Sequence, residues 1–244
     1  FMTSTIRNPD SDFQSQLIET KLPTVLNSEN RQRADLCSGN ASFERTIRMS
    51  AGDESKQTES NTQLATFGGG CFWCTEAVFL RLRGVKKVVS GYTGGKTVNP
   101  TYKEVCQGDT GHAEVIQVAF DPKEITYEQL LDVHMHTHDP TTLNRQGADV
   151  GTQYRSSIFF HDATQKQAAK KMIDDLNKSG DFDDPIVTTL EEMKKFYPAE
   201  DYHQNYFALN PNQGYCVAVV GPKVSKFQKR YKELLRKDDG ETQK

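Results

Sequence analysis

The stretch Phe67-Gly68-Gly69-Gly70-Cys71-Phe72-Trp73-Cys74 marks a change from strand-like to helix-like sequence. Leu64 to Phe67 reads as a short strand, and from Thr75 onward apolar residues follow helical spacing towards a C-cap at Gly84. Cys71 is therefore predicted at the first turn of a helix, beside unpaired amides and the positive end of the helix dipole. Because helix N-termini lower thiol pKa values, we expect a reactive thiolate at Cys71.

The elements predicted around this turn alternate as β-α-β-β-α-β. That order favours an α+β fold, a ferredoxin-like βαββαβ plait with a mainly antiparallel sheet and helices packed on one face. After the first strand and helix, the pattern predicts strands at 85–92, 112–120 and 156–160, a helical turn at 100–106, a helix capped by Thr126 and a helix over 163–177 capped by Asp162.

The C-terminal third is less regular. We expect an edge strand over 186–190, a helix over 199–209 and a basic amphipathic helix over 223–236. The loop Asn210-Pro211-Asn212-Gln213-Gly214 is rich in turn residues. It predicts a long irregular C-terminal arm that carries Cys216.

Composition indicates a soluble protein with one sizeable core. The chain has 244 residues, a net charge of −3 and 35% hydrophobic residues. No apolar run approaches the roughly 20 residues that cross a bilayer, and the mixed charge gives no reason to expect nucleic acid or a membrane as partner. We expect a polar, largely irregular extension (residues 1–62), a catalytic domain (63–236) and a polar tail (237–244).

Five cysteines and no secretory segment favour a reducing compartment and chemical use of the thiols over a disulfide framework. The expected location is the cytoplasm. Arginines among serines in the extension leave organellar targeting open.

Six ordered motifs resemble peptide methionine sulfoxide reductase A, a family that reduces the S epimer of methionine sulfoxide. The likeness runs from about residue 64 to about residue 220. The motifs are Gly70-Cys71-Phe72-Trp73, Gly91-Tyr92-Thr93-Gly94-Gly95, Asn99-Pro100-Thr101-Tyr102, Gly108-Asp109-Thr110-Gly111-His112-Ala113-Glu114, His138-Asp139-Pro140-Thr141 and Gly151-Thr152-Gln153-Tyr154-Arg155-Ser156.

The resemblance implies roles for individual residues. Cys71 would attack the sulfoxide sulfur, release methionine and keep the oxygen as a sulfenic acid. Glu114 would be the general acid, with a pKa raised by burial. The remaining implied roles are hydroxyls that bind the sulfoxide oxygen (Tyr102 and Tyr154), an aromatic wall for the S-methyl group (Phe72 and Trp73) and a carboxylate near the substrate (Asp149).

Two cysteines compete to resolve the sulfenic acid. Cys216 matches the resolving cysteine of the family, whereas Cys74 stands where many members have glycine and completes a Cys-x-x-Cys motif. Our hypothesis is that Cys216 attacks first and that Cys74 exchanges second or substitutes for it. Cys106 is predicted to be a buried structural cysteine, and Cys37 to be inert.

The resemblance also implies the co-substrates. They are oxidised proteins or peptides, free methionine sulfoxide and a dithiol reductant such as thioredoxin, with no metal or other cofactor. Three alternatives stay open: a thiol-disulfide oxidoreductase that uses only Cys71 and Cys74, a non-catalytic reader of oxidised methionine, and a metal-binding module. The last would need His134, His136 and His138, of which only the first and third share a helix face.

Overall fold

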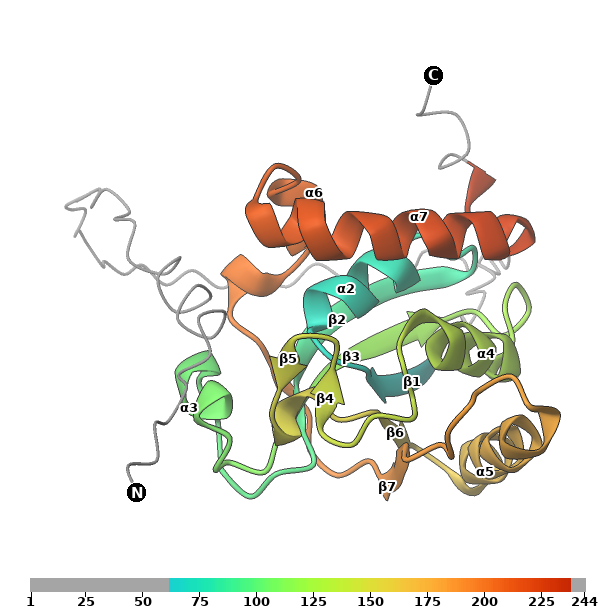
Figure 1. Cartoon of the computed structure of the whole chain (residues 1–244), viewed down its shortest axis with the longest axis horizontal. Coiled ribbons are helices and arrows are strands. Elements are labelled where there is room, and N and C mark those ends of the chain that lie inside the picture. The colour runs from blue at the N-terminus through green and yellow to red at the C-terminus, as the bar shows by residue number, and fades with distance from the viewer. Residues whose placement is uncertain (1–61, 238–244) are drawn as a thin grey trace, which may run out of the picture.

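The structure, a computed structural model, describes residues 62–237. A six-stranded sheet runs through the centre of this part of the chain (Figure 1). The predictions for the N-terminal extension, for Cys37 and for the tail from 238 fall outside these residues. The strand order is β7-β6-β1-β3-β2-β8. The strands are β1 (Gln63–Gly68), β2 (Val85–Thr93), β3 (Ala113–Phe120), β6 (Ser157–Phe160), β7 (Thr189–Glu192) and β8 (Tyr197–Pro198).

The four central strands confirm the predicted plait. Strand β3 pairs antiparallel with both β1 and β2, and β6 pairs antiparallel with β1. Helix α2 (Phe72–Phe79) connects β1 to β2, and α4 (Tyr127–Thr137) lies between β3 and β6 in the chain. Helix α5 (Ala163–Ser179) leads from β6 to the parallel edge strand β7, which begins three residues later than the predicted start at 186.

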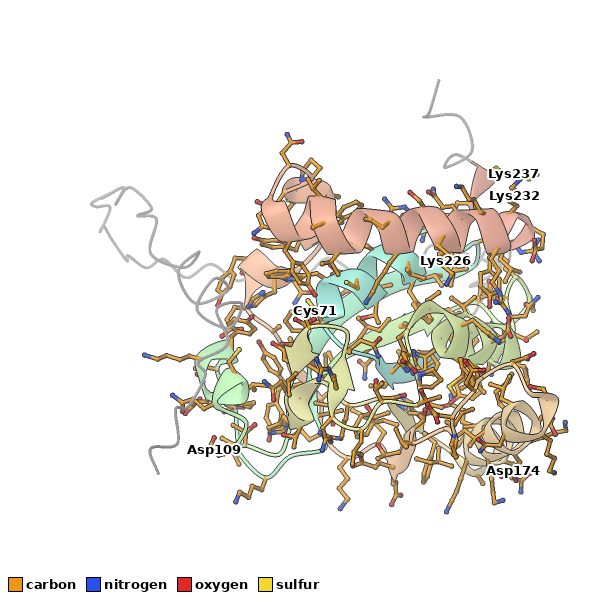
Figure 2. The ribbon with its side chains drawn as sticks, in the orientation of Figure 1. Cys71, Asp109, Asp174, Lys226, Lys232 and Lys237 are labelled. Carbon is orange, nitrogen blue, oxygen red and sulfur yellow. The ribbon has the colours of Figure 1, made fainter. Side chains whose placement is uncertain are left out.

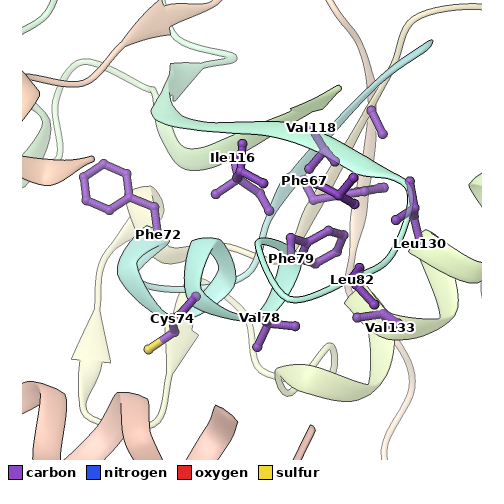
Figure 3. Packing of buried hydrophobic residues seen from close by; sticks show 14 of the residues in the cluster. Phe67, Phe72, Cys74, Val78, Phe79, Leu82, Ile116, Val118, Leu130 and Val133 are labelled. Carbon is purple, nitrogen blue, oxygen red and sulfur yellow. The ribbon is translucent and has the colours of Figure 1, made fainter. Parts of the chain in front are cut away.

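Helices α2 and α4 cover one face of the sheet and bury the main core. Phe67 of β1 lies under Phe79 of α2, with ring centroids 5.5 Å apart, and Leu130 and Val133 of α4 are fully buried beside them (Figure 3). All eight residues of α2 are buried. A helix that is buried all round needs cover on every side, and helix α7 (Gly221–Arg230) supplies it on the side away from the sheet (Figure 1).

Local sequence sets most helix starts. Thr126 and Asp162 cap α4 and α5 by accepting hydrogen bonds from the backbone N–H of Gln129 and Gln165.

Helix α2 is shorter than predicted, since it ends at Phe79 instead of continuing towards Gly84. The backbone at 81–83 bonds instead to residues 234–236, because Arg83 N donates to Leu234 O at 2.8 Å. That tertiary pairing overrides the helical spacing.

The predicted C-terminal helix at 199–209 is wrong as a single element. It is a 3₁₀ turn, η2 (Asp201–His203), and a short helix, α6 (Tyr206–Leu209), separated at Gln204 and Asn205. The Gln204 side chain bonds to both backbone groups of Ser90 on β2, and Asn205 has a φ of 52°. These two features break the helix.

The irregular arm is also shorter than predicted. A π-helical turn, η3 (Cys216–Val220), runs directly into α7, so the chain is helical from Cys216 to Arg230. A last 3₁₀ turn, η4 (Lys232–Leu234), replaces the end of the expected basic helix. Within residues 62–237, no helix combines the length and the apolar character needed to cross a bilayer.

Candidate active site

Cys71 is the N-cap residue of α2, as the glycine-rich stretch predicts (Figure 2). The preceding Gly70 has a φ of 84°, and a Cβ atom there would lie 2.5 Å from Cγ of Gln146. Gln146 belongs to the small hairpin of β4 (Arg145–Gln146) and β5 (Asp149–Val150). Only glycine can therefore bring the chain under this hairpin and into α2.

Cys71 and Cys74 form a thiol pair at the start of α2. Both are about 3% exposed, and the Cys71 side chain donates a hydrogen bond to Cys74. Burial raises the pKa of Cys71 well above its ordinary value, whereas the hydrogen bond from Cys71 lowers the pKa of Cys74. The expected low pKa of Cys71 is therefore wrong for the resting protein, because loss of water outweighs a dipole effect of about 0.3–1 kcal/mol.

Glu114 lies in β3, directly opposite Tyr92 of β2 and beside the start of α2. Its side chain is 1% exposed, and Oε2 accepts a hydrogen bond from Phe72 N at 3.1 Å. Burial raises the pKa of Glu114 to about 8, although the Phe72 amide opposes the shift. The carboxyl group is thus mostly protonated at neutral pH and can donate a proton beside Cys71.

Tyr102 and Tyr154 complete this group from two other elements. Tyr102 is the first residue of α3 (Tyr102–Gln107), whose Thr101 cap forms a full capping box, and Tyr154 ends the 3₁₀ turn η1 (Thr152–Tyr154). Both are buried, and burial followed by the charge of Glu114 raises the pKa of each phenol. Both hydroxyl groups therefore keep their protons beside Glu114.

Phe72 and Trp73 line the same place with aromatic rings. The Phe72 ring lies 6.4 Å from Tyr102 and 5.9 Å from Tyr92, measured between centroids. Trp73 donates from Nε1 to Nδ1 of His203 at 3.1 Å and stacks on Tyr206 at 3.7 Å with an interplanar angle of 6°. The two rings lie 6.5 Å apart between centroids, and residues from η2 and α6 contact the outer side of Trp73.

Asp149 reaches the group from the β4–β5 hairpin. It is half-buried, and its Oδ2 accepts a hydrogen bond from the Tyr215 hydroxyl at 2.7 Å. Asp149 also raises the pKa of Cys71, Glu114 and Tyr154, although other causes are larger. The hairpin and the segment before η3 therefore meet above the two thiols.

Cys216 lies fully buried at the first residue of η3, which packs on α2. Burial raises the pKa of Cys216, and the charge of Cys74 raises it further. Figure 3 shows Cys74 on the side of α2 away from Phe79 and Ile116. Cys74 thus interacts with both Cys71 and Cys216. The prediction for Cys106 is wrong, because the short helix α3 leaves this cysteine exposed.

The three histidines of α4 and its C-cap do not converge. The rings of His134 and His138 stack 4.4 Å apart, as their shared face predicts, while His136 bonds to Asp132 on the same helix. His138 is bound through Nδ1 to His134 O and through Nε2 to Ser156 Oγ. Within residues 62–237, no group of three or more histidine, cysteine, aspartate or glutamate side chains is placed to hold a metal ion.

Sequence reasoning missed the residues that hold the outer side of the site. Tyr206 and Tyr215 contact Trp73, and Glu200 accepts hydrogen bonds from the Tyr92 hydroxyl and from Tyr102 N. A signal was available in the density of aromatic residues between Tyr202 and Tyr215. Spacing alone could not show which of these rings would lie on Trp73.

Comparison with known proteins places the chain among sulfoxide reductases. A model described as peptide methionine sulfoxide reductase matches residues 63–235. The peptide methionine sulfoxide reductase MsrA of Acinetobacter baumannii strain AYE is 59% identical over 174 residues, which are 71% of this chain and 99% of that one. The protein of the same name from Deinococcus radiodurans is 58% identical over 172 residues, 70% of this chain and 84% of that one.

A solved structure agrees with the fold. Mxr1 from Saccharomyces cerevisiae in reduced form is similar with a TM-score of 0.59 and 38% sequence identity, and the match covers 66% of this chain and 92% of that chain.

Proposed function

We propose that this chain, which belongs to the peptide methionine sulfoxide reductase family, reduces methionine (S)-sulfoxide in proteins, and free, back to methionine. One observation carries the proposal. A thiol, a carboxylic acid and two phenols, from Cys71, Glu114, Tyr102 and Tyr154, meet at the N-terminus of α2. Reduction of a sulfoxide needs a nucleophile for sulfur and proton donors for oxygen.

The polar sulfoxide oxygen and the apolar S-methyl group of the substrate would bind to different residues. The sulfoxide oxygen accepts hydrogen bonds from the Glu114 carboxyl and the two tyrosine hydroxyls, all of which carry protons. The S-methyl group lies against Phe72 and Trp73. Such fixed donors stabilise charge that develops on the oxygen during attack, because they need no reorganisation in a buried site.

The chemical step transfers one oxygen atom. The Cys71 sulfur attacks the sulfoxide sulfur and forms an S–S bond while Glu114 protonates the sulfoxide oxygen. The hydroxyl group then moves from the substrate sulfur to the Cys71 sulfur as the S–O bond and the new S–S bond break, which leaves methionine and a sulfenic acid on Cys71. The proton of the Cys71 thiol leaves along its hydrogen bond to Cys74 and replaces the proton that Glu114 has given up, so the carboxyl group ends the step protonated. The sum is one thiol and one sulfoxide converted into one sulfenic acid and one thioether.

The hydrogen bond between Cys71 and Cys74 favours Cys74, not Cys216, as the first resolving residue. Residues three apart on a helix have Cβ atoms about 5–6 Å apart, so a disulfide from Cys71 to Cys74 needs only a small local change. Attack by Cys74 releases water and forms that disulfide. Cys216, whose pKa the charge of Cys74 raises, then displaces Cys71 and forms a Cys74–Cys216 disulfide. A dithiol protein of the thioredoxin type reduces it and restores three thiols.

The assay that tests this function compares the two epimers. Purified protein is incubated with dithiothreitol and either methionine (S)-sulfoxide or methionine (R)-sulfoxide, as free amino acid and within a peptide. We expect methionine from the S form only. Equal turnover of both epimers, or disulfide exchange without sulfoxide reduction, would contradict the proposal and favour a general thiol-disulfide oxidoreductase.

A further inference from the structure

A second buried carboxyl group lies on α2 and takes no part in the steps above. Glu76 is 2% exposed, and its two oxygens accept hydrogen bonds from the backbone of another segment, Oε1 from Asn205 N at 2.9 Å and Oε2 from Tyr206 N at 3.3 Å. Burial raises the pKa of Glu76, and these hydrogen bonds oppose the rise. Burial of a carboxylate costs free energy unless hydrogen-bond donors satisfy it. We therefore ask what these two hydrogen bonds of Glu76 do for the structure.

The two amides that Glu76 binds belong to the start of α6. Asn205 is the N-cap residue of that helix and provides no side-chain cap of its own. Its φ of 52° turns the chain sharply between η2 and α6. The first amides of a helix have no partner within the helix, and a carboxylate is their preferred cap. Glu76 therefore caps α6 from a different helix, across 129 positions of sequence.

This cap fixes the residues that cover Trp73. Tyr206, whose amide Glu76 holds, stacks on the indole ring at 3.7 Å. His203, two residues before Asn205, accepts the indole N–H. Glu76 and Trp73 are three residues apart on one helix and so lie on neighbouring positions of its surface. Helix α2 therefore carries Trp73 and also binds, through Glu76, the segment that packs on the outer side of the Trp73 ring.

We propose that Glu76 is a positioning residue for substrate binding: it holds α6 so that Tyr206 supports the Trp73 wall against the S-methyl group. The inference rests on the function proposed above. Glu76 does not contact the reacting atoms. Its loss therefore weakens binding of the methyl group, and raises KM, while the proton donors and Cys71 keep their places and kcat changes little.

Glu76→Gln tests the proposal with little change of shape. The amide keeps one acceptor oxygen, but its NH₂ group faces a second backbone N–H, so one hydrogen bond is lost and two donors meet. We expect KM to rise about tenfold, because a buried hydrogen bond is lost, and kcat to stay within about twofold. Should this variant fail to fold, Glu76→Asp, which withdraws the charge by one methylene group, is measured in the same way.

Trp73 gives a readout that does not depend on activity, because it is the only tryptophan of the chain. The ring is 4% exposed, and its emission should move to longer wavelength in Glu76→Gln as Tyr206 loosens. The matched control is Glu192→Gln, at an exposed position of β7 on the far edge of the sheet, which should change neither emission nor KM. Unchanged emission in the Glu76 variant overturns the inference even if the wild-type protein reduces sulfoxides.

A double-mutant cycle shows whether Glu76 acts through Tyr206. Tyr206→Ala should raise KM by itself, and adding Glu76→Gln should raise it no further, because neighbours that act as one unit are not additive. Additive effects would mean that Glu76 affects binding by another route, and the proposal would fall. If wild-type protein has no reductase activity while the emission still shifts, the proposed function fails and the role of Glu76 in holding α6 stands.

Discussion

The sheet side and the C-terminal side of the site are held in different ways. On the sheet side, Cys71 and Glu114 are placed by strand register and by a helix whose residues are all buried. On the C-terminal side, Tyr206 and Tyr215 are placed by individual hydrogen bonds and ring contacts with residues of α2 and the β4–β5 hairpin. Groups on a rigid scaffold suit the chemical step, and groups on an added segment suit binding and recycling. The predictions that follow separate the two sides.

Removing the nucleophile should have the largest effect. Cys71→Ser keeps the shape of the turn but replaces a thiol by a hydroxyl, which is far less nucleophilic towards sulfur. We expect no methionine above background, measured by chromatography after incubation with methionine (S)-sulfoxide and dithiothreitol. Ser179→Ala, at the exposed end of α5, is the control and should keep the wild-type rate. Residual turnover in Cys71→Ser would remove this residue from the mechanism.

Removing the proton donor should have the next largest effect. Glu114→Gln keeps the hydrogen bond acceptor for Phe72 N but cannot donate a proton, so kcat should fall about 10²–10⁴-fold. Since the pKa of Glu114 is about 8, the wild-type rate should fall as pH rises above that value, and the variant should lose this dependence. Steady-state rates between pH 6 and pH 10 measure both effects. A full rate at pH 7 in the variant would disprove the assignment.

Changes to the resolving cysteines should spare the first turnover. Cys74→Ser and Cys216→Ser leave Cys71 and Glu114 intact, so each should release about one methionine per protein in the absence of reductant. Thiol titration and mapping of disulfides then separate the two. The proposed order predicts a stable Cys71–Cys74 bond in Cys216→Ser and an accumulated sulfenic acid in Cys74→Ser. A Cys71–Cys216 bond forming at the wild-type rate in Cys74→Ser would restore the order expected from the sequence.

The smallest effect concerns stability. The pKa of Glu114 is about 8 in the folded protein, against an ordinary value of 4.5, so the folded state binds more protons between these pH values. Its contribution to the free energy of unfolding therefore becomes less favourable as pH rises from about 4.5 to 8, by on the order of a few kcal/mol. Glu114→Gln lacks this penalty. Its Tm, measured by calorimetry, should exceed that of the wild type at pH 9 and match it near pH 5.

Particular residues show how far sequence reasoning reached. The glycines before Cys71 predicted its place at the start of α2, because a bared backbone followed by helical spacing has few other solutions. Glu114 could be chosen only through the family motif, since one glutamate on a strand gives no sign of its burial. The low pKa expected for Cys71 was wrong, because the burial that reverses it arises from elements distant in sequence.

The sequence by itself determined the order of strands and helices, the strand-to-helix turn at Cys71 and the caps of α4 and α5, because these depend on the pattern of neighbouring residues. Tertiary structure alone decided that Glu76 caps α6, that Tyr206 covers Trp73 and that Cys216 interacts with Cys74. These contacts join residues about 130 or more positions apart. Only the folded core decides which polar side chains are buried and which hydrogen-bond partners they find. Burial and these partners together set the protonation state of each group and the role it can take in the reaction.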